Sequence, residues 1–143
     1  RRRRERPLSQ GVRVVRLAIA VMLVVAVLTG AILLVGLWLD TRESADARCL
    51  AAEIPAGVAV SEVALISAEA TAWPVGRRCE WQAASGGGVV VTQTGWPRTI
   101  GFAVVGALSA CVAILGMRRR RPAAIAPLAV CLVLYGLAVF WAG

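Results

Sequence analysis

Three long runs of apolar residues interrupt an otherwise mixed sequence. Residues 17–39 have Thr29 as their one polar side chain, residues 99–117 are rich in Gly and Ala, and residues 123–142 end in Phe140 and Trp141. None of these runs contains Asp, Glu, Arg, Asn or Gln. A helix needs about 20 apolar residues to cross about 30 Å of hydrocarbon. The pattern therefore predicts three transmembrane helices with these bounds.

Residues 40–98, between the first two runs, are more polar and contain three prolines and a Gly86–Gly88 run. Residues 40–52 are good helix formers, which favours an extension of the first helix or a short separate helix. Residues 58–73 alternate apolar and polar side chains in part, which favours a half-buried strand. Their Glu, Ala and Leu content leaves a helix open.

Two further stretches, 77–84 and 89–94, flank a Ser-Gly-Gly-Gly turn. This pattern is typical of a β-hairpin. We therefore expect residues 40–98 to fold as a small module, with a three-stranded antiparallel meander that ends at Trp96 and Pro97.

The distribution of arginine predicts the orientation in the membrane. Residues 1–16 carry a net charge of +6 and the short segment 118–122 carries +4, whereas residues 40–98 carry −2. Short basic segments stay in the cytoplasm. We therefore expect residues 1–16 to be a cytoplasmic tail and 118–122 a cytoplasmic loop of a multi-pass plasma membrane protein. Residues 40–98 and the C-terminus are expected on the extracytoplasmic side.

A cleaved signal peptide is the competing interpretation of the first run. Ala45-Asp46-Ala47 matches the small-residue pattern of a signal-peptidase site. However, the apolar region of a signal peptide usually has about 7 to 15 residues, and the motif lies well past the end of the longer run seen here. We expect the first run to remain as a transmembrane helix.

The composition argues against most catalytic chemistry. The 143 residues are 59% hydrophobic and 17% charged, with a formal net charge of +8, and include no histidine and no lysine. Without histidine the chain lacks the usual general base and the commonest zinc, copper and haem ligand. Without lysine it has no P-loop lysine and forms no Schiff base. We expect no enzymatic activity and no cofactor.

The four cysteines divide into two pairs. Cys49 and Cys79 belong to the module, where an extracytoplasmic compartment favours a disulfide, and a metal site would need further ligands. Cys111 and Cys131 lie in the second and third runs, where packing is favoured over a redox pair. The predicted fold class is a mainly α membrane protein, with three transmembrane helices and a small disulfide-linked, β-rich extracytoplasmic module.

The second run is crowded with small residues, which let helices approach closely in lipid. The candidate packing residues are Gly101, Ala103, Gly106, Ala107, Ala110 and Cys111. At a four-residue spacing, Ala103, Ala107 and Cys111 form one face, and Gly106 with Ala110 forms another. Ala26 and Gly30 in the first run have the same four-residue spacing. Such faces either pack the three helices against one another or leave one face for a partner subunit, and both interpretations stay open at this point.

Two runs of four arginines are candidates for binding anionic lipid headgroups, at about 1 kcal/mol per basic residue. They comprise Arg1, Arg2, Arg3, Arg4, Arg118, Arg119, Arg120 and Arg121. As determinants of topology they need no further role. Nucleic acid is not an expected partner, because no aromatic residues interleave with the arginines.

The tryptophans have two expected roles. Trp38, Trp96 and Trp141 fall at the extracytoplasmic ends of the spans, which is typical of residues at a membrane interface. We expect Trp73 and Trp81 to pack on the disulfide and the hairpin rather than to form a ligand site.

Several short motifs carry a resemblance to known proteins. They are Cys49, Pro55-Ala56-Gly57, Arg78-Cys79-Glu80-Trp81 and the Gly95-Trp96 step before a further span. In these the chain resembles small multi-pass membrane proteins of high-GC Gram-positive bacteria. The resemblance covers the module and its flanks, and it implies an envelope protein with an outward disulfide-bonded loop and no agreed activity. An arginine-only basic set independently fits a GC-rich genome.

These features favour a non-enzymatic accessory subunit that stabilises or helps assemble a larger membrane protein complex. Among such complexes we favour a respiratory one, although no residue specifies it. One alternative is a component of a small homo-oligomeric channel or transporter, but ionisable residues normally mark ion paths and the spans contain none. The other is an envelope sensor, which the short cytoplasmic segments disfavour.

Overall fold

The computed structural model describes residues 8–59 and 64–142, and within these ranges three helices are long and apolar enough to cross a membrane. The candidate spans are Arg13–Thr41, Trp96–Arg118 and Pro122–Ala142. The predicted runs 17–39, 99–117 and 123–142 lie within them. The predicted arginine run at residues 1–4 and part of the strand predicted at 58–73 lie outside the described residues.

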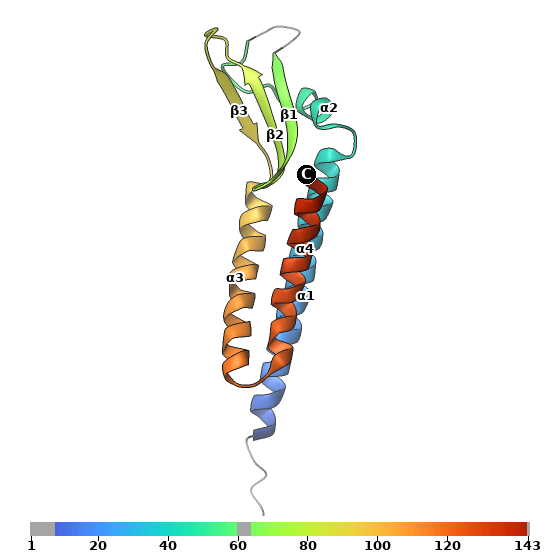
Figure 1. Cartoon of the computed structure of the whole chain (residues 1–143), viewed down its shortest axis with the longest axis vertical. Helices are drawn as coiled ribbons and strands as arrows, with labels where there is room; N and C mark the ends of the chain where they lie inside the picture. Colours follow the sequence, from blue (N-terminus) through green and yellow to red (C-terminus); the bar gives the residue numbers. More distant parts are fainter. Residues whose placement is uncertain (1–7, 60–63, 143) are drawn as a thin grey trace, which may run out of the picture.

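The elements follow one another along an elongated molecule (Figure 1). Their order is α1 (Leu8–Thr41), α2 (Ala45–Leu50), β1 (Leu65–Ala72), β2 (Val75–Gln82), β3 (Val89–Gln93), α3 (Trp96–Arg118), the 3₁₀ helix η1 (Pro122–Ile125) and α4 (Ala126–Ala142). The sheet and α2 lie at one end of the helices, and the turn between α3 and η1 lies at the other (Figure 1).

The helices pack around α1, which contacts both α3 and α4. Ala26, Leu33 and Leu37 of α1 are fully buried. Gly30 lies directly against Leu134 of α4, so that even a methyl group at this position would force the Leu134 side chain to shift. The small residues predicted in the first run therefore serve packing within the chain. Thr29 is accommodated in this apolar helix because its hydroxyl donates to the Val25 carbonyl at 2.8 Å.

The sheet has the predicted antiparallel order β1-β2-β3, with Cys79 of β2 opposite Ala68 and Thr92. Residues 65–72 form a strand, so the helix left open there is wrong. The Gly-rich turn joins β2 to β3, as expected. The predicted strand 77–84 instead spans Val75–Gln82, because Val75 and Gly76 already pair with the end of β1, opposite Ala72 and Thr71.

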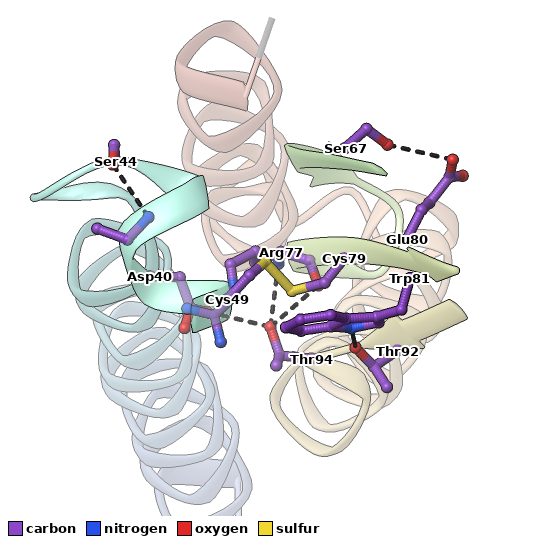
Figure 2. Close-up of a disulfide and its surroundings, with 11 residues drawn as sticks. Asp40, Ser44, Cys49, Ser67, Arg77, Cys79, Glu80, Trp81, Thr92 and Thr94 are labelled. Carbon is purple, nitrogen blue, oxygen red and sulfur yellow. Dashed lines mark hydrogen bonds between the residues drawn. A yellow bond between two sulfur atoms is a disulfide. The ribbon is translucent and has the colours of Figure 1, made fainter. Parts of the chain in front are cut away.

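A Cys49–Cys79 disulfide joins α2 to β2, with the two Cα atoms 6.0 Å apart. Ser44 caps the N-terminus of α2, and its hydroxyl accepts from the Ala47 amide at 3.2 Å. Trp81 is 2% exposed beside the disulfide, and its indole N–H donates to the Thr92 hydroxyl at 3.2 Å (Figure 2). The fold class expected from the sequence, three apolar helices with a small disulfide-linked β module, is confirmed.

Candidate functional site

The sheet is fixed to the helices through the backbone of Val75, the first residue of β2. Its N–H donates to the Thr99 hydroxyl at 2.9 Å, and its carbonyl accepts from Arg98 Nε at 3.3 Å. Thr99 and Arg98 lie in the first turns of α3, and Thr99 is buried. The Val75 side chain is fully buried in the same core as Leu37 and Phe102. The start of β2 is therefore part of the helical core.

An ion pair between Arg98 and Asp40 adds α1 to this contact. The two side chains are 21% and 18% exposed, so the pair is largely shielded from solvent. Gly36, one turn before Asp40, lies against the Arg98 guanidinium, which would have to move to admit a side chain there. The Thr94 hydroxyl lies 3.5 Å from Asp40 Oδ2 and accepts from the Arg77 amide at 3.0 Å (Figure 2).

The third helix joins the same contact through Tyr135 of α4. The Tyr135 hydroxyl donates to the Ala72 carbonyl at the end of β1, at 3.4 Å. We call this cluster, formed by Asp40, Ala72, Val75, Arg98, Thr99 and Tyr135, the joint. It connects the turn between β1 and β2 to all three long helices, so the module and the helices are held in one fixed arrangement.

An apolar groove of about 250 Å³ lies directly beneath the joint, between α3 and α4. We call it the lateral groove. Its walls include Trp73, Phe102, Ala103, Gly106, Leu128 and Leu132. The Thr99 and Tyr135 side chains also line it, but their hydroxyls already bond to the sheet. The groove therefore offers shape and apolar contact with little polar recognition.

The lateral groove corrects the expectation for Trp73. The sequence predicts that this side chain packs on the disulfide and the hairpin, yet it is 56% exposed and lines the groove, whereas Trp81 packs on the disulfide as expected. The reason is position. Trp73 follows the end of β1, in the turn that meets the helices, so its ring lies over α3 and α4 rather than over the disulfide.

The small residues of α3 divide between two faces of the helix. The face toward the other helices carries Thr99, Phe102, Ser109, Ala113 and Gly116. Among the predicted packing residues, Gly106 and Ala110 are half-buried, whereas Gly101, Ala103, Ala107 and Cys111 are exposed. The predicted Ala103-Ala107-Cys111 face therefore makes little contact within the described chain, and Ala103 forms the edge it shares with the lateral groove.

The two remaining cysteines do not face one another. Cys111 is exposed on α3, whereas Cys131 of α4 is buried with its Sγ 4.0 Å from the Ser109 hydroxyl. Ser109 thereby has a polar neighbour in an apolar core. Within residues 8–59 and 64–142, no group of three or more His, Cys, Asp or Glu side chains is arranged to hold a metal ion.

The joint is the feature that sequence reasoning missed. Asp40 directly follows the first apolar run and Arg98 directly precedes the second, so opposite charges flank the ends predicted to lie on the same side of the membrane. That signal was available from the sequence. The contacts of Tyr135 and Thr99 with the sheet have no comparable local signal.

The arginines of the second run lie at the opposite end of the molecule from the joint. Arg118, the last residue of α3, is exposed; in the turn to η1, Arg119 and Arg120 are exposed and Arg121 is half-buried.

The chain matches no protein-family model, no curated protein and no solved structure. The resemblance to envelope proteins of high-GC bacteria therefore stays a prediction from the sequence motifs. The described chain has three candidate membrane-spanning helices and a disulfide-linked module.

Proposed function

We propose that this protein is a non-enzymatic accessory subunit that stabilises a larger integral membrane complex. The lateral groove and the exposed Ala103-Ala107-Cys111 face are the docking surface for a helix of the partner. The observation that carries the proposal is that these two surfaces share Ala103 on one side of the molecule.

The packing physics of membranes supports this assignment. Lipid chains are as apolar as leucine, so helices associate through close van der Waals contact at small residues rather than through the hydrophobic effect. The α3 face offers that close approach, and the groove beside it accepts larger side chains from a partner helix. The joint holds the module rigidly above, so a partner would meet one preformed surface and lose little conformational entropy on binding.

The proposal includes an orientation, with the N-terminus and the turn at residues 118–121 in the cytoplasm and the module outside. Its support is the distribution of charge. The four consecutive arginines lie at the end opposite the sheet, and the disulfide lies at the sheet end (Figure 1). Basic loops stay in the cytoplasm and disulfides persist outside it.

Co-purification in mild detergent tests the proposed docking surface. We expect the wild type to recover a larger membrane protein in constant stoichiometry, and Ala107→Phe to lose it because the ring prevents close helix approach. Ala31→Phe is the matched control, since Ala31 is exposed on α1 and lies in neither the α3 face nor the groove. A monodisperse monomer without a stoichiometric partner contradicts the proposal, as does equal loss in both variants.

A further inference from the structure

A second crevice, of about 200 Å³, lies between α1 and α3 at the end of the molecule opposite the sheet. We call it the arginine crevice. Its walls are apolar and belong to both helices, and they include Val14, Ala18, Ile19, Val112 and Leu115. Arg119 and Arg121 line its end, beyond the last residue of α3. The crevice therefore combines an apolar wall with two cationic groups at one end.

The turn that carries these arginines has a fixed backbone. The Arg121 N–H donates to the Gly116 carbonyl at 2.8 Å, and the Arg120 N–H donates to the Met117 carbonyl at 2.9 Å. With Arg120 at a φ of 54°, this is the bonding pattern of a Schellman C-cap. Gly116 is buried against Ala124 of η1, which closes the turn. The hydrogen-bonded turn therefore fixes the backbone positions from which the Arg119 and Arg121 side chains extend.

The charge at this end of the molecule is uncompensated within the described residues. Among the residues that the structure describes, the acidic ones all lie between Asp40 and Glu80, in the segment at the sheet end. Arg13 and Arg16, exposed on α1, add further positive charge near the crevice end. An anionic group at Arg119 and Arg121 would therefore meet attraction from several guanidinium groups and no nearby carboxylate among the described residues.

We propose that the arginine crevice binds one anionic phospholipid, with its phosphate on Arg119 and Arg121 and an acyl chain along the apolar wall. Guanidinium groups bind phosphate oxygens in a paired geometry. Val112 lies about 10 Å along α3 from Arg119, at 1.5 Å per residue, so the wall extends into the hydrocarbon region. An apolar crevice at that depth is filled by lipid chains, and the arginines select the headgroup.

Lipid binding to the purified full chain tests this inference. The probes are dioleoylphosphatidylglycerol and dioleoylphosphatidylcholine, which share their acyl chains, and native mass spectrometry counts the lipids retained. The wild type should retain the phosphatidylglycerol preferentially. R119Q/R121Q should weaken that binding about thirtyfold, since each arginine near the surface contributes about 1 kcal/mol and 1.4 kcal/mol is tenfold.

R118Q/R120Q is the matched control, because it removes the same charge from the same turn at residues that do not line the crevice. It should weaken phosphatidylglycerol binding less than about threefold, because these two charges lie outside the crevice and are screened by salt. Equal losses in the two double variants would mean general attraction to the basic turn and would overturn the proposal. Equal retention of both lipids by the wild type would overturn it too.

A second pair of variants tests the apolar wall without altering charge. Ala18→Leu places extra methyl groups inside the crevice, whereas Ala20→Leu adds them at an exposed position that does not line it. Only Ala18→Leu should reduce phosphatidylglycerol retention, and unchanged retention would contradict the placement of the acyl chain. This arm remains decisive if R119Q/R121Q does not fold. Loss of a protein partner without loss of lipid in R119Q/R121Q would instead identify a protein contact.

The lipid site is independent of the proposed docking surface. The arginine crevice and the lateral groove share no lining residue, and they lie between different pairs of helices, α1 with α3 and α3 with α4. Failure of co-purification leaves the lipid result unaffected, and failure of lipid selection leaves the subunit proposal unaffected.

Discussion

Asp40 and Arg98 are 58 residues apart in the chain and form an ion pair where the sheet meets the helices. Each charge lies at the helix end where the helix dipole disfavours its sign. Asp40 lies in the last turn of α1, where the helix dipole favours a cation, and Arg98 lies in the first turn of α3, where it favours an anion. Their mutual attraction, together with the bond from Arg98 to the Val75 carbonyl, offsets both unfavourable placements.

Asp40→Asn should therefore lower the free energy of unfolding by about 2 kcal/mol, between the values for exposed and for fully buried ion pairs. The substitution leaves a shielded guanidinium without its carboxylate. Denaturation of the purified protein in micelles measures the change. Glu43→Gln is the control, because Glu43 is exposed and its pairs with Arg42 and Arg48 should contribute less than about 1 kcal/mol. Equal losses of unfolding free energy in Asp40→Asn and Glu43→Gln would show that shielding from solvent does not strengthen the Asp40–Arg98 pair.

Gly95→Ala should destabilise the joint by about 2 kcal/mol or more. Gly95 precedes α3 with a φ of 92°, which other residues adopt at a cost of about 1 to 3 kcal/mol. A Cβ there would also collide with the Val75 carbonyl, which is rigid backbone.

The comparison variant for Gly95→Ala is Gly101→Ala. Gly101 lies in α3 with a helical backbone, and a Cβ there has no described neighbour within 4 Å. Thermal unfolding should show no loss for Gly101→Ala and a clear loss for Gly95→Ala. A similar midpoint for the two would show that the close approach of Gly95 to Val75 is unimportant.

Cys49→Ser should reduce the stability of the module by about 3 to 4 kcal/mol. The disulfide joins residues with a sequence separation of 30, and the chain-entropy estimate for such a loop gives that range. Near-ultraviolet circular dichroism reports the packing of Trp81 on the disulfide. Cys111→Ser, at an exposed position outside the module, should leave that signal unchanged. A non-reducing gel should show altered mobility for Cys49→Ser alone.

Arg120→Gly should stabilise the turn between α3 and η1 by about 1 kcal/mol, because Arg120 has a left-handed backbone that glycine adopts freely. Arg118→Gly removes the same charge from the last turn of α3 and should cost about 1 kcal/mol of helix stability. The opposite signs separate the backbone effect from the charge. Unfolding in micelles measures both changes. A lower free energy of unfolding in both variants would contradict the strain at residue 120.

Cysteine labelling in intact cells checks the proposed orientation. In a Cys111→Ser/Cys131→Ser background, Ser85→Cys in the hairpin turn should react with a membrane-impermeant maleimide. Arg118→Cys should react only after the membrane is permeabilised. Both positions are exposed, so access to solvent does not distinguish them. The reverse pattern would place the module in the cytoplasm and remove the support for the orientation.

Local patterns were enough to locate the main elements. Apolar length predicts the spans, because crossing hydrocarbon requires about 20 residues whatever the helices contact. The Gly86–Gly88 run marks the hairpin, and the disulfide partners follow from Cys49 and Cys79 being the cysteines of the module. The four-residue spacing of Ala26 and Gly30 correctly marked a packing face, although its partner helix could not be read from it.

The rotation of each helix about its axis was decided by the tertiary structure. Successive helical residues are about 100° apart, so a single apolar run contains every possible buried face. The sequence left open whether Ala103, Ala107 and Cys111 face inward, and packing on α1 turned them outward. In the same packing, Cys131 lies beside Ser109 and does not face Cys111, and Trp73 lies over the groove.

The sequence by itself thus determined which segments are apolar enough to span a membrane, where the chain turns, and which end is basic, because these properties depend on composition and near neighbours. The tertiary structure decided the joint, the lateral groove and the arginine crevice. Each requires side chains far apart in the chain to meet, as Asp40 and Arg98 do. That meeting depends on helix rotation and crossing, which are set by the sum of many packing contacts.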